Sequence, residues 1–333
     1  MQEVNLKVGV CAGNLEESEL GKQANIMGSI NVGSASKKYP YNFGVIPREY
    51  SNVDSAVYVI CISYDSANNP IMSSRGGPGG ILRASRNLEL FDSELGIETY
   101  KIGIYTMDEV EPNSNCPFEN SQVVEAVVGE VLNSDKFPVV VGGDHSLTLG
   151  AVRAAANKYQ DLGVVIFDAH PDLFDEYEST KYGHASVARR IDELGIPLSI
   201  VGVRTASRDE TEFINKSGIT VVGAREVLKS KEAFEGVLSM LPERVYLSVD
   251  VDVMDPGEMP AVANPEPGGL GWYDMEECFE RLISKKTVVS FDVVELCPIM
   301  GNPTPDFIAA KLIYRLIGLI FRDKLLSVSG EQD

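Results

Sequence analysis

The chain has 333 residues, of which 44% are apolar and 23% charged, and its formal net charge is −20. This length and composition allow a buried core, either in one large α/β domain or in two average ones. The negative charge argues against nucleic acid or an anionic membrane as a partner, and it favours the approach of a cationic small molecule. A need for solubility would by itself explain such a charge, without any cationic partner.

Short β-branched runs alternate with longer helical segments from about residue 57 onward. The expected strands cover, in chain order, residues 57–62, 99–104, 138–141, 164–167, 199–203, 220–222, 245–249 and 288–294. The clearest expected helices cover residues 79–90, 121–132, 146–158 and 306–321, and Ser146 is the expected N-cap of the third. The strands at 138–141 and 164–167 are apolar throughout, which predicts a parallel sheet covered by helices on both faces.

The sequence contains no linker rich in Pro, Gly or Ser, no internal repeat and no low-complexity tract. We therefore expect a single domain over residues 1–333. Residues 1–55 are less regular than the rest, and we expect them to form an N-terminal extension of the same domain. An edge strand at residues 5–10 is expected within this extension.

Cysteine usage and the apolar segments bear on the cellular compartment. The five cysteines form no CxxC pair, and such an odd, scattered set predicts reduced thiols in a cytoplasmic protein. The first residues include an early glutamate and no long apolar stretch, unlike a secretory signal. The most apolar late stretch, residues 312–321, contains Arg315 and is too short to span a bilayer.

All three histidines lie in short glycine-flanked or carboxylate-rich motifs, and two of these motifs directly follow expected strands. His145 lies in Gly-Gly-Asp-His-Ser and His170 in Asp-Ala-His-Pro-Asp. The segment Ser-Val-Asp-Val-Asp-Val-Met-Asp-Pro adds Asp250 and Asp252 after a third strand, and Glu295 follows a fourth. Because the carboxyl ends of parallel strands meet at one edge of a sheet, we expect these side chains to lie close together.

Carboxylates packed this densely would repel one another unless they were protonated or held a cation. Each motif by itself is more often a capped turn than a metal site. Their occurrence after successive apolar strands favours a shared site instead. Two imidazoles with several carboxylate oxygens suit Mn²⁺ better than a structural zinc ion, and two such ions would generate a nucleophile from a bridging water near neutral pH.

The order and spacing of GGDHS, DAHPD and SVDVDVMDP resemble those of the ureohydrolase family, which includes arginases and agmatinases. The resemblance extends from about residue 57 to 321, and it implies a three-layer α/β/α fold with a mainly parallel central sheet. It also implies two Mn²⁺ ions per subunit. Carried over position by position, the ligands of one ion are His145, Asp168, Asp172 and Asp250. Those of the other ion are Asp168, His170, Asp250 and Asp252, so that Asp168 and Asp250 bridge the two.

The same resemblance implies hydrolysis of a guanidinium group to urea and an amine. A guanidinium is a planar, delocalised and poor electrophile, so it needs a strong nucleophile close by and a carboxylate to hold it. Glu295 matches the family's substrate-binding glutamate, and Asp172 matches the residue that passes a proton to the leaving amine. His184, in Tyr-Gly-His-Ala-Ser, matches its proton-shuttling histidine near the mouth of the site. A surface ion pair for Glu295 and a turn-capping role for His184 are the plainer alternatives.

The identity of the substrate depends on positions away from the metal motifs. Arginases carry Arg-Asp-Val-Asp where this chain reads Arg-Thr-Ala-Ser, so Thr205 and Ser207 replace two carboxylates that help to bind the α-amino group of arginine. The DAHPDL and YGHASVARR segments look closest to those of prokaryotic agmatinases, especially archaeal ones. We therefore expect a cationic guanidino small molecule as substrate, with agmatine, hydrolysed to putrescine and urea, as the first choice.

Three alternatives stand beside this expectation. The first is an arginase or another amidinohydrolase that acts on guanidino or formimidoyl acids. The second is a zinc deacetylase of related fold, which needs one metal ion and therefore has no use for both Asp172 and Asp252. The third is a non-catalytic metal-binding protein, which would need neither Glu295 nor His184. The family resemblance also implies a homo-oligomer, a trimer or a hexamer.

Overall fold

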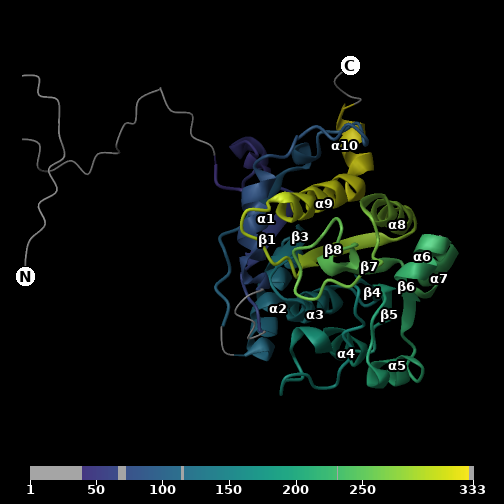
Figure 1. Ribbon diagram of the computed structural model, residues 1–333. Coiled ribbons are helices and arrows are strands. Elements are labelled where there is room, and N and C mark those ends of the chain that lie inside the picture. The colour runs from purple at the N-terminus through teal and green to yellow at the C-terminus, as the bar shows by residue number, and fades with distance from the viewer. Residues whose placement is uncertain (1–39, 67–72, 114–115, 231, 330–333) are drawn as a thin grey trace, which may run out of the picture. The chain divides into compact units, whose positions relative to one another are not determined.

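The computed structural model describes residues 40–66, 73–113, 116–230 and 232–329, and one eight-stranded sheet lies at its centre (Figure 1). The strands are β1 (Val57–Ile62), β2 (Ile104–Thr106), β3 (Phe137–Gly142), β4 (Leu162–Phe167), β5 (Leu198–Val203), β6 (Thr220–Gly223), β7 (Arg244–Asp250) and β8 (Thr287–Val294). Their order across the sheet is β2-β1-β3-β8-β7-β4-β5-β6, and every pairing between them is parallel. The prediction of a mainly parallel sheet is confirmed.

Helices cover both faces of this sheet, as the continuously apolar strands predict. Figure 1 shows α1, α8 and α9 on one side of the sheet and α2, α3 and α4 on the other. The helices are α1 (Gly77–Ser85), α2 (Pro117–Asn133), α3 (Thr148–Lys158), α4 (Val187–Asp192), α5 (Arg208–Ile214), α6 (Ala224–Lys229), α7 (Glu232–Met240), α8 (Trp272–Lys285), α9 (Thr304–Ile320) and α10 (Arg322–Ser329).

Two hydrophobic cores lie between these layers, one on each face of the sheet. Successive side chains of a strand point to opposite faces, so each interior strand contributes to both cores. In β3, Val139 and Val141 join the core that includes α8 and α9, whereas Val140 joins the core that includes α2 and α3. The three-layer α/β/α fold is thus confirmed in its architecture and in its packing.

The prediction of a strand at residues 99–104 is wrong for most of these residues. Residues Thr99–Ile102 form a 3-10 helix, and only Ile104–Thr106 form a strand, which is the edge strand β2. Gly103 separates the two elements with a φ of 85°, a left-handed conformation that ends the helix. The alternation of apolar and polar residues in this stretch is therefore a property of two short elements and not of one strand.

Several helix boundaries also differ from the expectation. The first helix begins at Gly77, because Pro78 occupies the first turn, where its missing N–H costs nothing, and it ends at Ser85 rather than at residue 90. Ser146 is not the N-cap of α3. It lies in a 3-10 turn, His145–Leu147, and the carboxylate of Asp144 accepts a hydrogen bond from its backbone N–H at 3.1 Å.

The N-terminal extension is described only from residue 40. Residues 40–55 hold two 3-10 turns, Phe43–Val45 and Arg48–Tyr50, and the side chains of Phe43 and Ile46 are fully buried in the core beside α9. The edge strand expected at residues 5–10 lies outside the described residues, so a single domain over residues 1–333 stays a prediction. Within the described part of the chain, the four cysteines form no disulfide bond, and none of the helices is both long and apolar enough to cross a bilayer.

Candidate metal centre

The four chain segments that carry the predicted site residues leave the sheet at its carboxyl-terminal edge. They follow β3, β8, β7 and β4, which are consecutive neighbours in the sheet although they are far apart in the sequence. This edge is where open α/β sheets bind their ligands. The strand order therefore explains how residues between 144 and 295 meet in one place.

Two glycines at the end of β3 pack so closely against other parts of the protein that neither position has room for a side chain. A Cβ on Gly143 would lie 1.7 Å from the carbonyl oxygen of Tyr64, and a Cβ on Gly142 would lie 2.8 Å from a methyl group of Val294. Only glycine fits such close approaches. The turn thereby presses the chain against β1 and β8 and buries His145 completely.

His145 is the centre of a first cluster of side chains. Its Nδ1 atom lies 3.1 Å from Oδ2 of Asp168, 3.1 Å from Oδ2 of Asp172 and 3.4 Å from Oδ2 of Asp250. Asp172 has a φ of 51°, a left-handed conformation that side chains other than glycine rarely adopt. Such local strain in a buried loop is common at functional sites.

A second cluster shares Asp168 with the first. Nδ1 of His170 lies 2.8 Å from Oδ2 of Asp252 and 3.5 Å from Oδ1 of Asp168. The other oxygen of Asp252 accepts a hydrogen bond from the backbone N–H of Ala169 at 3.0 Å, which ties the loop after β7 to the loop after β4. One oxygen of Asp250 likewise accepts from the backbone N–H of Asp252 at 2.8 Å.

These two clusters are the groups among the described residues that have the composition and spacing of a metal site. One consists of His145, Asp168 and Asp250 and the other of Asp168, His170 and Asp252, with the ligand atoms of each within 4.8 Å of one another. Asp172 adjoins the first group. The structure thus brings together all six side chains that the sequence predicts as ligands. Asp168 belongs to both groups, whereas bridging by Asp250 stays a prediction.

A hydrogen-bond relay behind His145 determines which of its nitrogens faces the carboxylates. Nε2 lies 3.0 Å from the hydroxyl of Ser248, which in turn donates to Oδ1 of Asp292 at 2.6 Å. Since this serine hydrogen is committed to a carboxylate, Nε2 is the donor toward Ser248. In neutral His145, Nδ1 then carries a lone pair directed at the carboxylate cluster.

Two buried acceptor atoms lie in contact in this cluster, and in neutral His145 no hydrogen atom lies between them. Nδ1 of His145 and Oδ2 of Asp168 lie 3.1 Å apart, and neither takes part in a hydrogen bond with the described residues. Two lone pairs in contact repel, so either an additional proton or a cation must lie between the groups. The donors are imidazole nitrogen and carboxylate oxygen, which suit divalent cations such as Mn²⁺. The residues present therefore fit a metal centre.

The pKa values of these groups also indicate that the cluster needs a proton or a cation. Burial lowers the pKa of His145, but the carboxylates of Asp168, Asp172 and Asp250 outweigh burial and raise it well above its usual value. Burial together with Asp252 and Asp168 raises the pKa of Asp250. Without a cation the cluster would thus retain protons at neutral pH, and a bound cation would take the place of that positive charge.

Glu295 lies beside this cluster at the end of β8. Its backbone has a φ of 66°, and its N–H donates to the carbonyl of Gly143 at 2.8 Å. One carboxylate oxygen accepts a hydrogen bond from the backbone N–H of His145 at 2.7 Å. Burial, followed by the charges of Asp250 and Asp144, raises the pKa of Glu295 well above its usual value. A surface ion pair for Glu295 is therefore wrong, because its neighbours are carboxylates inside the site.

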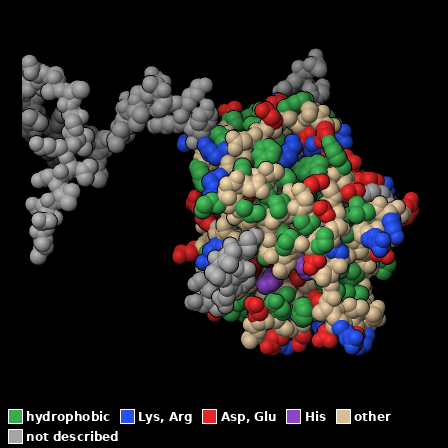
Figure 2. Space-filling model, in the orientation of Figure 1, with side chains coloured by type: hydrophobic (Ala, Val, Ile, Leu, Met, Phe, Trp, Pro, Cys, Tyr) green, Lys and Arg blue, Asp and Glu red, His purple; other side chains and the backbone are tan. Residues whose placement is uncertain are grey.

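A pocket of about 680 Å³ opens above the two clusters. Figure 2 shows histidine side chains reaching the surface on this face of the molecule. Nine carboxylate residues are among the described residues that line the pocket, and neither lysine nor arginine is among them. The acidic residues are Asp65, Asp144, Asp172, Glu178, Glu210, Asp250, Asp252, Glu266 and Glu295. The pocket is therefore suited to a cation.

His184 also lines this pocket, at the start of the turn His184–Ser186 that precedes α4. Its ring contacts the ring of Tyr177 edge to face, with centroids 5.7 Å apart. The side chain of His184 forms no cap to this turn; the residue before the turn is Gly183. The structure thus places His184 on the wall of the pocket.

Sequence reasoning missed the residues behind the centre. Asp292 is fully buried and accepts hydrogen bonds from Ser248, Tyr246 and Thr148. A sequence signal for it exists, because a lone aspartate interrupts the apolar run of β8. Asp144 caps the turn that carries His145, because its carboxylate accepts a hydrogen bond from the backbone N–H of Ser146 at 3.1 Å. Asp255 likewise accepts hydrogen bonds from backbone N–H groups of a turn, Gly257 among them.

Comparison with known proteins agrees with this geometry. The model of the arginase family matches residues 55–318. The chain belongs to the arginase family. Like other members it is a hydrolase, which removes the non-catalytic metal-binding protein as an alternative. The zinc deacetylase alternative also loses its basis, because the matched relatives are ureohydrolases.

Individual arginase-family members are similar over most of their length. The N(1)-aminopropylagmatine ureohydrolase of Synechocystis is 36% identical over 278 residues, which cover 80% of this chain and 90% of that protein. The agmatinase of Pyrococcus horikoshii is 35% identical over 291 residues, which cover 85% and 99%. The crystal structure of the agmatine ureohydrolase of Thermoplasma volcanium is 33% identical and superposes with a TM-score of 0.74, covering 87% of this chain and 96% of that one.

Proposed function

We propose that the protein hydrolyses the guanidinium group of a small molecule with a cationic tail, releasing urea and an amine. Agmatine, which would give putrescine and urea, is the first candidate. The observation that carries this proposal is the pocket above the His–Asp clusters, which is lined by nine carboxylate residues and, among the described residues, by neither lysine nor arginine. Such a pocket attracts a cation and repels an anion.

The candidate cofactor is a pair of Mn²⁺ ions. His145, Asp168, Asp172 and Asp250 would hold one ion, and Asp168, His170, Asp250 and Asp252 the other. When bound, these ions would lower the pKa of a water molecule in the pocket and so supply a nucleophile at neutral pH. The relay from Asp292 through Ser248 supports this assignment, since it turns the lone pair of His145 toward the carboxylates.

Glu295 is the candidate for holding the guanidinium group. Its carboxylate lies at the pocket wall beside the cluster, and it is fixed by the backbone N–H of His145. A carboxylate can accept two parallel hydrogen bonds from a guanidinium, which fixes the orientation of the planar group as well as its position. The arrival of this cation would also stabilise the charged form of Glu295, whose pKa is raised in the free site.

Asp172 and His184 are the candidates for moving protons. Asp172 lies on the pocket wall beside His145, where its carboxylate would accept a proton and pass it on. In the metal-free protein, burial and the neighbouring Asp168 raise the pKa of Asp172 to about 6, and a bound cation would lower it. An amine leaves more readily once it is protonated. His184, on the pocket wall nearer to solvent, would exchange protons between the site and water.

The tail of the substrate is expected to carry an amine rather than a carboxylate. Thr205 and Ser207 line the pocket where two acidic residues would bind the α-amino group of arginine. Arg204 offers no partner for a carboxylate, because its guanidinium donates to backbone carbonyls, including those of Asp252 and Glu266. The carboxylate of arginine or of a guanidino acid would therefore meet neither lysine nor arginine on the described wall of the pocket, which carries nine carboxylate residues.

N(1)-aminopropylagmatine is a second candidate substrate. Relatives named for its hydrolysis occur in Synechocystis and in Thermus thermophilus, at 36% and 34% identity. This molecule carries one more amine than agmatine, so it meets the same demand for positive charge along the pocket.

Urea release from a panel of guanidines tests the proposal. The Mn²⁺-loaded protein would be assayed with agmatine, N(1)-aminopropylagmatine, arginine and 4-guanidinobutyrate. We expect kcat/KM for one of the two amine-tailed substrates to exceed that for the two carboxylate-bearing ones by about 100-fold or more, as for charge reversal in a desolvated site. A preference for arginine or guanidinobutyrate, or no urea from any of the four, would refute the proposal.

A further inference from the structure

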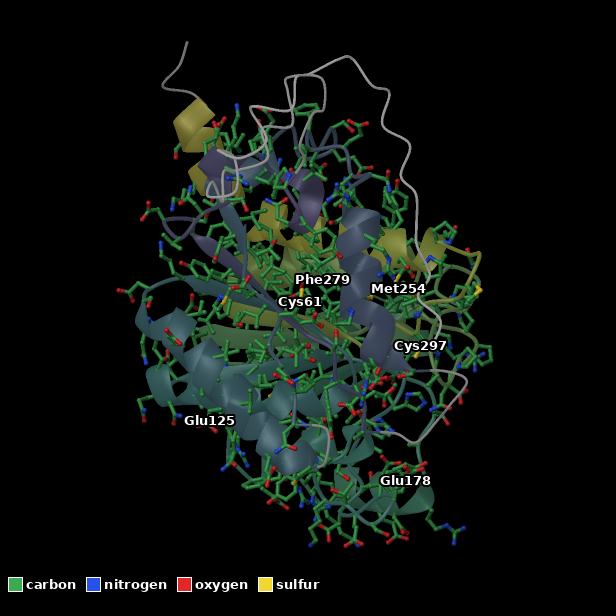
Figure 3. All side chains as sticks on the ribbon, turned by 90° about the vertical axis from the view of Figure 1, so that its left-hand side faces the viewer. Cys61, Glu125, Glu178, Met254, Phe279 and Cys297 are labelled. Carbon is green, nitrogen blue, oxygen red and sulfur yellow. The ribbon has the colours of Figure 1, made fainter. Side chains whose placement is uncertain are left out.

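One wall of the pocket is aromatic as well as acidic. Phe174, Tyr177, Glu178 and His184 all line it, and they come from the single loop that joins β4 to α4. The ring centroids of Phe174 and Tyr177 lie 5.3 Å apart, and those of Tyr177 and His184 lie 5.7 Å apart. Figure 3 labels Glu178 on this loop and Cys297, which lines the pocket from the segment after β8. The two residues mark different walls of one pocket.

This loop is held in place by hydrogen bonds of its own backbone and side chains. The N–H of Phe174 donates to the carbonyl of Ala185 at 3.1 Å, and Tyr177 and Thr180 exchange a pair of backbone hydrogen bonds at 2.9 and 3.0 Å. Asp175 pairs at 2.8 Å with Arg190, a nearly buried residue of α4. The aromatic rings are therefore positioned before a ligand arrives, which lowers the entropy lost on binding.

The tip of the loop adopts a conformation that glutamate and serine rarely take. Glu178 and Ser179 have φ values of 49° and 63°, as in the tight turns where glycine and asparagine are preferred. The turn leaves Tyr177 38% exposed beside the pocket. The Glu178 side chain forms no ion pair with any other residue that the structure describes.

Aromatic faces with an adjacent carboxylate are the combination that recognises an alkylammonium ion. The ring face carries negative partial charge that attracts a cation, and the carboxylate adds a direct electrostatic attraction. The metal clusters and Glu295 meet the guanidinium end of a substrate, and they leave its other end without a partner. The loop supplies a partner of suitable chemistry on the wall of the same pocket.

We propose that Phe174, Tyr177 and Glu178 form a subsite for the ammonium group at the far end of the guanidino substrate. This inference rests on the proposed function. According to this inference, one loop selects amine-tailed substrates, and the negative charge of the whole pocket adds to this selection. Tyr177 is the central residue, because its ring contacts both Phe174 and His184.

A pair of substrates that differ only in tail charge tests the subsite. In pentylguanidine a methyl group replaces the terminal ammonium of agmatine. We expect Tyr177→Leu to raise KM for agmatine about tenfold, the loss of one cation–π contact, with little change in kcat. KM for pentylguanidine should stay within about twofold. Tyr177→Phe, which keeps the aromatic face, should restore most of the affinity for agmatine. Equal effects of Tyr177→Leu on both substrates would overturn the proposal.

Two glutamates in the loop provide a matched comparison of charge. Glu178 lines the pocket, whereas Glu176 is exposed in the same loop and does not line it. We expect Glu178→Gln to raise KM for agmatine several-fold and to leave KM for pentylguanidine alone, with Glu176→Gln as the control for net charge. If the two variants shift KM for agmatine equally, the effect is one of overall charge and Glu178 has no place in the subsite.

A binding measurement separates failure of the subsite from failure of the proposed function. If the wild-type protein releases no urea from any guanidine, the proposed function is wrong. Calorimetric titration of the Mn²⁺-loaded protein with 1,4-diaminobutane, which has no scissile group, then decides on the subsite by itself. We expect Tyr177→Leu to weaken this binding about tenfold. Equal affinity in wild type and variant, or no binding to either, would overturn the inference.

Discussion

The hydroxyl of Ser248 lies 3.0 Å from Nε2 of His145, and this contact decides which nitrogen of the imidazole faces the carboxylate cluster. The serine is held in turn by Asp292, a buried carboxylate that also accepts from the hydroxyl of Tyr246 at 2.6 Å. A row of hydrogen-bonded polar side chains thus runs from the interior of the sheet to the candidate metal centre. It consists of Tyr246, Asp292, Ser248 and His145.

Removal of the Ser248 hydroxyl should weaken metal binding without unfolding the protein. We expect Ser248→Ala to lower the affinity for Mn²⁺ about 10- to 100-fold, since groups that orient a metal-binding histidine have effects of this size. Isothermal titration with Mn²⁺ measures the change. Ser199→Ala is the matched control, because Ser199 on β5 is also buried and its hydroxyl forms no hydrogen bond with the described residues. Equal affinities in the two variants would refute the role of Ser248.

Metal binding should release protons. Burial lowers the pKa of His170, but Asp168 and Asp252 outweigh it and raise this pKa to about 12, so the metal-free protein keeps His170 charged at pH 7. A metal ligand must be deprotonated, so bound cations displace these protons. We therefore expect the apparent affinity for Mn²⁺ to rise with pH between 6 and 8, by about tenfold per unit for each proton released.

Calorimetric titration with Mn²⁺ in buffers of different ionisation enthalpy measures the number of protons released. A heat of binding that does not depend on the buffer would show that no net proton leaves. In that case the imidazoles would be neutral before the metal arrives, contrary to this account.

Glu295 should contribute to activity at the expense of stability. Burial and the charges of Asp250 and Asp144 raise its pKa above the usual 4.5, so in the metal-free protein its ionisation opposes folding. A raised folded-state pKa in an acid lowers stability as pH rises above the unfolded-state value. We expect metal-free Glu295→Gln to unfold about 2 °C higher than wild type at pH 8. The gain should be smaller at pH 5, where the wild-type side chain is more fully protonated.

The same substitution should impair catalysis. Loss of the negative charge removes the partner of the guanidinium, and we expect kcat/KM for agmatine to fall about 100-fold or more. Scanning calorimetry in a metal chelator and steady-state kinetics measure the two effects. A variant that is both less stable at pH 8 and fully active would contradict the placement of Glu295 at the substrate.

The glycine turn after β3 should tolerate no side chain at Gly143. A Cβ there would overlap the carbonyl of Tyr64, so Gly143→Ala must displace the turn that carries His145. We expect a loss of about 3 kcal/mol in the free energy of unfolding together with weaker Mn²⁺ binding. Gly218→Ala is the control, since nothing lies within 4 Å of a Cβ at that exposed position. Denaturant unfolding of both variants checks this, and a Gly143→Ala protein as stable as the control would contradict the packing.

The sequence predicts the sheet, and the edge of the sheet at which the site residues meet, because both depend on local sequence patterns. The apolar runs of β3 and β4 identify interior strands, and the motifs that follow them can be located by counting. Parallel pairing then brings His145 and His170 to the same edge without further information. Family resemblance supplied the assignment of Glu295 and His184, which spacing alone does not give.

Features that depend on tertiary contact could not be predicted in this way. The stretch around residue 100 alternates like a strand, but Gly103 breaks it, and the N–H of Tyr100 donates to the hydroxyl of Tyr314 on α9. The relay of Ser248 and Asp292 joins two strands whose register is visible only in the folded sheet. The aromatic loop lies between two histidine motifs, and nothing in its composition reveals that Phe174 and Tyr177 share a wall of the pocket.

The central claim is that the His–Asp clusters hold a pair of divalent cations, and metal content tests it most directly. Protein dialysed against Mn²⁺ and freed of unbound ion would be analysed by mass spectrometry for manganese per subunit. The account predicts two ions in the wild type and fewer in Asp252→Asn, which lacks one carboxylate of the second cluster. One ion or none in the wild type, at saturating Mn²⁺, would contradict it.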